Sequence, residues 1–214
     1  MAESDHTTLV TIDDHPLFRK GLADLIGMDP SLTLVGEAAT GEEGLRLAKE
    51  KHPDLILLDI NMKGMSGIET LRAIKQEDLD TRVLMLTVSD NEEDVVAALQ
   101  IGADGYLLKD MEPEDILDSL RKAAQGKVVI SEGLTLLLAK ALREPDLGAA
   151  NPISSLTTRE REILEQLAAG LSNRLIAAKL NISEGTVKVH VKNLLKKLGL
   201  HSRMEAAVWA LKHL

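Results

Sequence analysis

Cysteine is absent from the chain. Disulfide bonds, thiolate catalysis and zinc bound by cysteine are therefore excluded. Aromatic residues are nearly absent too, with one Phe, one Tyr and one Trp among 214 residues. The hydrophobic cores must therefore be aliphatic, and recognition of single-stranded nucleic acid by base stacking is disfavoured.

Long apolar runs are also missing from the sequence. No stretch approaches the roughly 18 residues that a membrane span needs. The amino terminus is acidic and polar, unlike a signal peptide. We therefore expect a cytoplasmic protein that makes no contact with a membrane.

Positive charge is scarce at the front of the chain and concentrated at the back. Residues 1–126 carry 12 Lys and Arg against 26 Asp and Glu, a balance of −14. Residues 127–152 are neutral, and residues 153–214 carry 10 basic against 5 acidic residues. This asymmetry predicts an acidic domain over 1–126, a linker over 127–152 and a basic domain over 153–214 suited to nucleic acid.

Five apolar segments in the first 126 residues alternate with five segments of helical periodicity. The alternation predicts a doubly wound, five-stranded parallel sheet, an α/β fold of the flavodoxin-like type. One segment, 55–58, is apolar without a break and stops on Asp59. Its period alone also permits a short buried helix, but Pro53 before it and the glycines after it favour a strand. The expected strands are residues 8–12, 32–38, 55–58, 83–86 and 105–108.

Polar side chains follow four of these strands, namely Asp13 with Asp14, Asp59, Thr87 and Lys109. Because the carboxyl ends of parallel strands meet at one edge, we expect these side chains to lie together. Crowded carboxylates repel one another unless a cation joins them, and oxygen ligands suit Mg²⁺. Asp59 is then a candidate nucleophile that forms an aspartyl-phosphate. Taken singly, each residue also fits a structural role, such as a helix cap or a surface charge.

The same residues, in this strand order, resemble the site of a bacterial response-regulator receiver domain over residues 7–126. The resemblance implies that Asp59 accepts phosphate from a sensor histidine kinase. It also implies that Mg²⁺ is held by Asp13 or Asp14, by Asp59 and by the backbone carbonyl of Asn61.

Further roles follow from the same resemblance. Thr87 and Tyr106 match the switch pair of the family. Asn61 and Ser89 match the positions that set the lifetime of the phosphate.

Two departures from the family pattern lie in the loops. Lys63 stands where the family often has Pro, and Asp110 follows Lys109 where many members have Pro. A cis peptide without Pro costs roughly 3 kcal/mol. The isomer of the Lys109–Asp110 bond therefore stays open at this point.

The segment after residue 126 is expected to connect two domains. Its apolar spacing predicts an amphipathic helix over 131–143, capped by Ser131. Residues 144–152 contain two prolines, one glycine and several small residues. Such a composition is typical of a flexible tether.

Residues 153–214 show four segments of helical periodicity, and they predict an all-α domain. A short helix, a tight turn and a cationic helix over 183–198 follow one another in helix-turn-helix order. A row of lysines on an isolated helix is more often only a solvated face. The expected N-caps are Thr157, which forms a capping box with Glu160, and Ser172, Ser183 and Ser202.

The stretch from Leu156 to Asn193 resembles the LuxR/FixJ-type DNA-binding domain, and the resemblance spans residues 153–213. It implies that helix 183–198 enters the major groove of double-stranded DNA, and that the protein binds paired half-sites as a homodimer. Lys188, Val189 and Lys192 would face base edges, where Lys donates to guanine and Val meets a thymine methyl. The expected phosphate contacts are Ser183, Thr186, Lys196 and Arg203.

Further stretches extend the resemblance over the whole chain, namely residues 13–16, 88–96, 102–115 and 206–209. They resemble the nitrate/nitrite regulators of the NarL/FixJ family. The resemblance implies a phosphorylation-controlled transcription regulator of anaerobic respiration genes, and not an enzyme.

One alternative is a phosphatase that forms an aspartyl-phosphate, but such enzymes often carry a second acid where this chain has Asn61. The other is a regulator with an inert receiver, which the complete polar set disfavours. We also expect the unphosphorylated receiver to pack against the basic domain and cover the Lys188 face.

Overall fold

The computed structural model describes residues 6–77, 79, 81–88, 91–127, 129–130, 152–200 and 202–214. The helix expected over 131–143, most of the expected tether and Ser89 lie outside the described residues. Within the described part of the chain, no helix combines the length and the apolar character that crossing a membrane requires.

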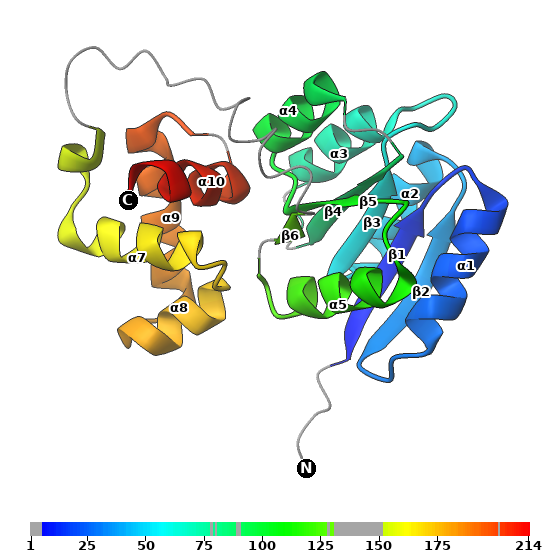
Figure 1. The fold of residues 1–214 in the computed structure, drawn as a ribbon, viewed down its shortest axis with the longest axis horizontal. Helices are drawn as coiled ribbons and strands as arrows, with labels where there is room; N and C mark the ends of the chain where they lie inside the picture. Colours follow the sequence, from blue (N-terminus) through cyan, green and yellow to red (C-terminus); the bar gives the residue numbers. More distant parts are fainter. Residues whose placement is uncertain are drawn as a thin grey trace.

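A parallel sheet forms the centre of the first half of the chain (Figure 1). Its strand order is β2-β1-β3-β4-β5-β6, and every neighbouring pair is parallel. All five predicted strands are present, so the predicted fold class is confirmed. The strands are β1 (Thr7–Ile12), β2 (Leu32–Ala38), β3 (Leu55–Asp59), β4 (Arg82–Thr87), β5 (Gly105–Leu108) and β6 (Val129–Ile130).

The predicted number of strands is corrected by β6, which extends the sheet from five strands to six. Val129 pairs with Gly105, and Ile130 pairs with Tyr106 on β5. Two residues are too few to produce a periodic pattern, so the sequence gives no signal for this strand within the expected linker. The segment expected to be a linker therefore begins by pairing with the sheet of the first half of the chain.

Helices cover both faces of the sheet (Figure 1). On one face, Leu22 of α1 and Leu120 of α5 join the core formed with Leu57. On the other face, residues of α2, α3 and α4 surround Ile56 and Leu58. All of β3 is buried, as its unbroken apolar run predicts for a strand covered on both sides. The helices are α1 (Pro16–Gly27), α2 (Gly41–Lys51), α3 (Gly67–Gln76), α4 (Glu92–Ile101) and α5 (Pro113–Ala124).

The last part of the chain has a helical core of its own. Leu164, Leu194 and Trp209 are among its buried members. A short 3₁₀ turn, Pro152–Ser155, precedes its four helices: α7 (Thr158–Ala168), α8 (Asn173–Leu180), α9 (Glu184–Leu198) and α10 (Arg203–His213). Each predicted N-cap accepts a hydrogen bond from the backbone of its helix: Thr157, Ser172, Ser183 and Ser202.

Helix α10 contributes to two cores at once. Ala206 and Trp209 belong to the helical core, whereas Met204 and Val208 join the core that lies beneath α4. Every residue from Met204 to Ala210 is consequently buried. The two halves of the chain therefore meet through apolar residues of α10.

A charge pair ties the end of α1 to α5. Asp29 is buried, and its carboxylate accepts hydrogen bonds from the backbone and hydroxyl of Ser31 at 2.8 and 2.7 Å. Arg121 Nε donates to the same carboxylate at 2.5 Å. These hydrogen bonds from Ser31, and then the one from Arg121, lower the pKa of Asp29 from 3.8 to about 2.

Replacing Asp29 by Asn should therefore destabilise the protein in a pH-dependent way. A carboxylate whose pKa is lower in the folded state than in the unfolded state stabilises the folded protein at pH values above its unfolded pKa. This contribution to stability disappears as the pH falls from about 4 towards 2. We expect a loss of roughly 1–2 kcal/mol at neutral pH in urea unfolding followed by circular dichroism.

The matched control is Asp118→Asn, because Asp118 pairs with Lys122 on the exposed face of α5. Exposed pairs contribute little, so this variant should unfold like the wild type. Equal unfolding curves for Asp29→Asn and the wild type at neutral pH would contradict the assignment.

Candidate phosphoacceptor site and nucleic-acid interface

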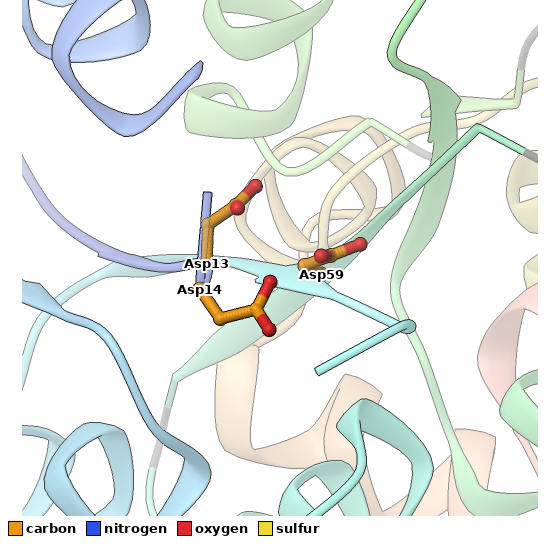
Figure 2. A group of neighbouring side chains, drawn as sticks. All are labelled: Asp13, Asp14 and Asp59. Carbon is orange, nitrogen blue, oxygen red and sulfur yellow. The ribbon is translucent and has the colours of Figure 1, made fainter. Parts of the chain in front are cut away.

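Three carboxylates gather where β1 and β3 end (Figure 2). These strands are neighbours, with Ile12 opposite Leu58, so Asp13, Asp14 and Asp59 leave the sheet at the same edge. One oxygen of each lies within 4.8 Å of those of the other two. We call these three residues the acidic site.

The acidic site is held in place by backbone donors. The amide of His15 donates to Asp13 Oδ1 at 2.8 Å, and the amide of Asn61 donates to Asp59 Oδ1 at 3.3 Å. The amide of Lys63 donates to Asp14 Oδ2 at 3.2 Å. Asp13 and Asp59 are buried, whereas Asp14 is partly exposed. The set offers only oxygen ligands at close range, which fits a hard divalent cation.

Lys109 compensates the negative charge of the acidic site. Its Nζ lies 2.7 Å from Asp13 Oδ2 and 2.9 Å from Asp59 Oδ2, and only 9% of its side chain is exposed. The Lys109 amide donates to the carbonyl of Thr87 at 2.7 Å, which fixes the end of β5 against β4. The ammonium is therefore placed where it can contact a group bound to Asp59.

Burial dominates the electrostatics of Asp59. It raises the pKa of this carboxyl above its ordinary value, while the hydrogen bond and charge of Lys109 oppose the shift and the charge of Asp13 adds to it. A carboxylate in this setting is only partly compensated by one ammonium. A bound cation would supply the missing positive charge.

Thr87 is the last residue of β4, and Tyr106 lies on the neighbouring strand β5, opposite Met85. Both side chains are buried, at 1% and 0% exposure. Burial raises the pKa of Tyr106, the Asp94 charge adds to the shift, and the Thr87 hydroxyl opposes it. Tyr106 also belongs to the core that includes Val208 of α10. This pair therefore links the edge of the sheet to the surface that contacts the helical half.

The loops around the acidic site answer the question about the Lys109–Asp110 peptide bond but not the one about phosphate lifetime. All described peptide bonds are trans, including the one between Lys109 and Asp110. Asn61 is exposed two residues after Asp59, the last residue of β3. Its predicted role and that of Ser89 in phosphate lifetime remain predictions, since Ser89 lies outside the described residues.

The lysine face of α9 is open in this structure. Lys188, Val189, Lys192 and Lys196 are all exposed, Val189 at 58%, while Val187 and the later apolar residues face the helical core. The expectation that the receiver covers the Lys188 face is therefore wrong for this structure. Opposite charge predicts that arrangement, but the buried apolar part of the contact between the halves runs through Met204 and Val208 of α10 and not through α9.

The start of α9 carries two of the expected phosphate contacts. Ser183 and Thr186 are exposed, and their hydroxyl oxygens lie 2.7 Å apart. The Thr186 amide donates to Ser183 Oγ at 3.0 Å, so Ser183 caps the helix. Both hydroxyls therefore sit at the positive end of the helix dipole, a position suited to a phosphate.

Arg203 does not lie on this open face. Its guanidinium donates to Asn173 Oδ1 at 2.7 Å and to the carbonyl of Leu171. Burial lowers the pKa of Arg203 to about 10, the Asp104 charge opposes the shift, and the Arg82 charge adds to it. Arg203 stays charged at neutral pH, but it fixes the turn between α7 and α8 next to the receiver. Its predicted phosphate contact needs a rearrangement.

The sequence reasoning missed two residues at the acidic site. The ring of Phe18 on α1 lies 4.7 Å from Lys109 Nζ, measured to its centroid. A Cβ added at Gly67 would lie 2.0 Å from the carbonyl oxygen of Asp59. In the sequence, the available signals are the position of Phe18 four residues after Asp14, at the start of a predicted helix, and the glycine in the loop that follows Asp59.

Family comparisons agree with this division of the chain. Residues 9–121 match the family "Response regulator receiver domain", and residues 154–210 match "Bacterial regulatory proteins, luxR family". The chain therefore belongs to the response regulators that join a receiver domain to a LuxR-type DNA-binding domain.

The chain is 53% identical over 209 residues to the nitrate/nitrite response regulator protein NarL of Escherichia coli strain K12, covering 98% of this chain and 97% of that protein. It is 46% identical over 210 residues to NarP of the same strain, covering 97% and 96%. A crystal structure of the response regulator ChrA of a heme-sensing two-component system matches with a TM-score of 0.54 and 35% identity, covering 97% and 98%. The same two-domain order is therefore shared over nearly the full lengths.

Proposed function

We propose that phosphorylation of Asp59 controls how the LuxR-type domain binds double-stranded DNA. The observation that carries the proposal is the pair of buried carboxylates in the acidic site, where Lys109 Nζ reaches both Asp13 and Asp59 within 2.9 Å. The phosphate comes from a sensor histidine kinase, as the receiver family implies. The receiver comprises residues 1–126, the linker 127–152 and the DNA-binding domain 153–214.

The acidic site would hold Mg²⁺ through Asp13 or Asp14, Asp59 and the Asn61 carbonyl. The bound cation supplies charge neutralisation for phosphoryl transfer. Asp59 attacks the phosphorus of the donor with a carboxylate oxygen, and the bond between phosphorus and the leaving atom of the donor breaks. That atom is an imidazole nitrogen in the phosphohistidine of a kinase and an oxygen in acetyl phosphate. Lys109 and the Thr87 hydroxyl lie at the neighbouring strand ends, from which they would contact the transferred group.

The product is a stored signal and not a released compound, so the chain is a switch and not an enzyme. Asn61 stands where a general acid or base would speed turnover, and an amide cannot take that role usefully. The phosphate would shift Thr87 and Tyr106 and so change the surface that packs against Met204 and Val208 of α10. Loss of this contact would free the DNA-binding domain to pair with a second copy on DNA.

Nitrate- or nitrite-responsive control of anaerobic respiration genes is the biological setting that we propose. It rests on the 53% identity to NarL and the 46% identity to NarP. The signal itself would be sensed by the kinase, since the role proposed for this chain is to accept phosphate and bind DNA. The protein would act in the cytoplasm, where its DNA lies.

DNA binding through the open face of α9 can be tested with single lysines. Lys192→Ala should weaken binding to a duplex selected in vitro from a random pool by about 5- to 150-fold, because one contact to a base edge is worth roughly 1–3 kcal/mol. Binding is measured with the phosphorylated full chain at one fixed salt concentration.

The control is Lys179→Ala, which removes the same charge from the same domain. Lys179 lies on α8 and donates to Gln166 Oε1 at 2.6 Å, away from the open face of α9. We expect a change of less than about 3-fold from this variant, as for a charge outside the interface. Equal losses for the two variants would show that only net charge matters, against the proposed interface.

A further inference from the structure

The amino-terminal turn of α1 approaches the acidic site with two side chains. Arg19 Nη1 donates to the carbonyl of Asp13 at 2.5 Å. Phe18, the only phenylalanine of the chain, places its ring 4.7 Å from Lys109 Nζ. The ring is partly buried and packs against the core under α1 and α5, so its position is fixed by the helix.

The geometry points to Phe18 as a positioning residue for Lys109, in which the face of its ring holds the ammonium beside Asp59. A cation within about 6 Å of a ring centroid is attracted by the negative face of the ring. The attraction is larger when the cation is desolvated, and the Lys109 side chain is only 9% exposed. This inference rests on the proposed function, because it assigns Phe18 a part in phosphate uptake.

The ring differs from the other partners of the ammonium in one respect. Asp13 and Asp59 both offer oxygens that a divalent cation would also bind, so the cation competes with Lys109 for them. A ring face has no oxygen and does not enter this competition. Phe18 therefore still attracts the Lys109 ammonium when a divalent cation also binds the carboxylates. The ring leaves the N–H groups of the ammonium available to a phosphoryl oxygen. Its contribution is larger in the loaded state than in the empty one, which is the condition for an effect on rate.

Two substitutions of Phe18 in the full-length chain separate the ring from its bulk. Phe18→Leu keeps an apolar side chain on the core but removes the ring, and Phe18→Tyr keeps the ring. Leu17→Ala is the control, since Leu17 is 83% exposed on the same turn. With acetyl phosphate and Mg²⁺, intact mass should show uptake slowed by about 2- to 30-fold in Phe18→Leu. Phe18→Tyr and Leu17→Ala should stay within about 2-fold of the wild type.

A second readout does not depend on phosphate uptake. In protein labelled with ¹³C-lysine, the ring current should shift the ε-methylene signal of Lys109 upfield, and Lys109→Arg identifies that signal by its loss. The shift should persist in Phe18→Tyr and disappear in Phe18→Leu. The inference is overturned if Phe18→Leu takes up phosphate at the wild-type rate, if Phe18→Tyr is as slow as Phe18→Leu, or if the Lys109 signal is the same in all three proteins. If the wild type takes up no phosphate, the proposed function fails, and the NMR signal alone decides on the contact.

Discussion

Replacing Asp59 by Asn is expected to abolish phosphate uptake. The amide is nearly the same size as the carboxylate, but it is not a nucleophile and gives Lys109 no negative charge. Of the carboxylates at the acidic site, Asp59 alone ends the buried strand β3 and accepts from both Lys109 and the Asn61 amide. Intact mass after incubation with acetyl phosphate and Mg²⁺ should show one phosphate adduct on the wild type and none on the variant.

Asp24→Asn is the matched control, because Asp24 is exposed on α1 and away from the site. It should take up phosphate like the wild type. A phosphate adduct that persists in Asp59→Asn would place the phosphoacceptor elsewhere and contradict the assignment of Asp59.

Adding one methyl group at Gly67 should disrupt the same site through the backbone. Its Cβ would lie 2.0 Å from the carbonyl oxygen of Asp59 and 2.7 Å from the Cα of Ile60. Because both atoms belong to the backbone at the end of β3, neither can rotate away. We expect Gly67→Ala to lose about 3 kcal/mol or more in urea unfolding followed by circular dichroism. Phosphate uptake should fall with it, since the Asp59 backbone must move.

Gly21→Ala makes the same chemical change where there is room. No atom lies within 4 Å of a Cβ built at Gly21, which faces solvent on α1. Alanine has the higher helix propensity, so this variant should be as stable as the wild type or more stable, by up to about 1 kcal/mol. Equal stability of the two glycine variants would contradict the close approach at Gly67.

The fold of the receiver could be predicted from the sequence because its signals are local. The apolar run 55–58 marks a buried strand without reference to any other segment, and Asp59 at its end then falls on the functional edge of the sheet. The helical half was predicted for the same reason. Each of its helices begins with a Ser or Thr that caps its own backbone, such as Ser183 before α9.

Contacts between distant segments could not be predicted in this way. The pairing of Val129 with Gly105 needs only two residues, and the approach of Phe18 to Lys109 joins residues on α1 and after β5. The wrong expectation about the Lys188 face has a similar cause. The sequence shows the charge of each half, but the face that packs is chosen by buried apolar residues such as Val208.

The contact between the two halves indicates how phosphate on Asp59 would act on the DNA-binding domain. Gly126 at the end of α5 has a φ of +76° and lies against Ser172, with a built Cβ only 2.3 Å from Ser172 Cβ. Together with Val208 beneath α4, this contact holds the DNA-binding domain through Ser172 and α10 and leaves the lysine face of α9 exposed. Control of DNA binding would then act on the pairing of two copies more than on access to the lysines.

The central claim is that phosphate on Asp59 controls DNA binding. The most direct test measures the affinity of the full-length chain for its selected duplex with and without acetyl phosphate and Mg²⁺, beside Asp59→Asn. We predict that phosphorylation tightens binding by about 5- to 150-fold in the wild type, the usual range of coupling between two sites, and leaves Asp59→Asn unchanged. An affinity that does not respond to phosphate, or that responds equally in Asp59→Asn, would contradict the claim.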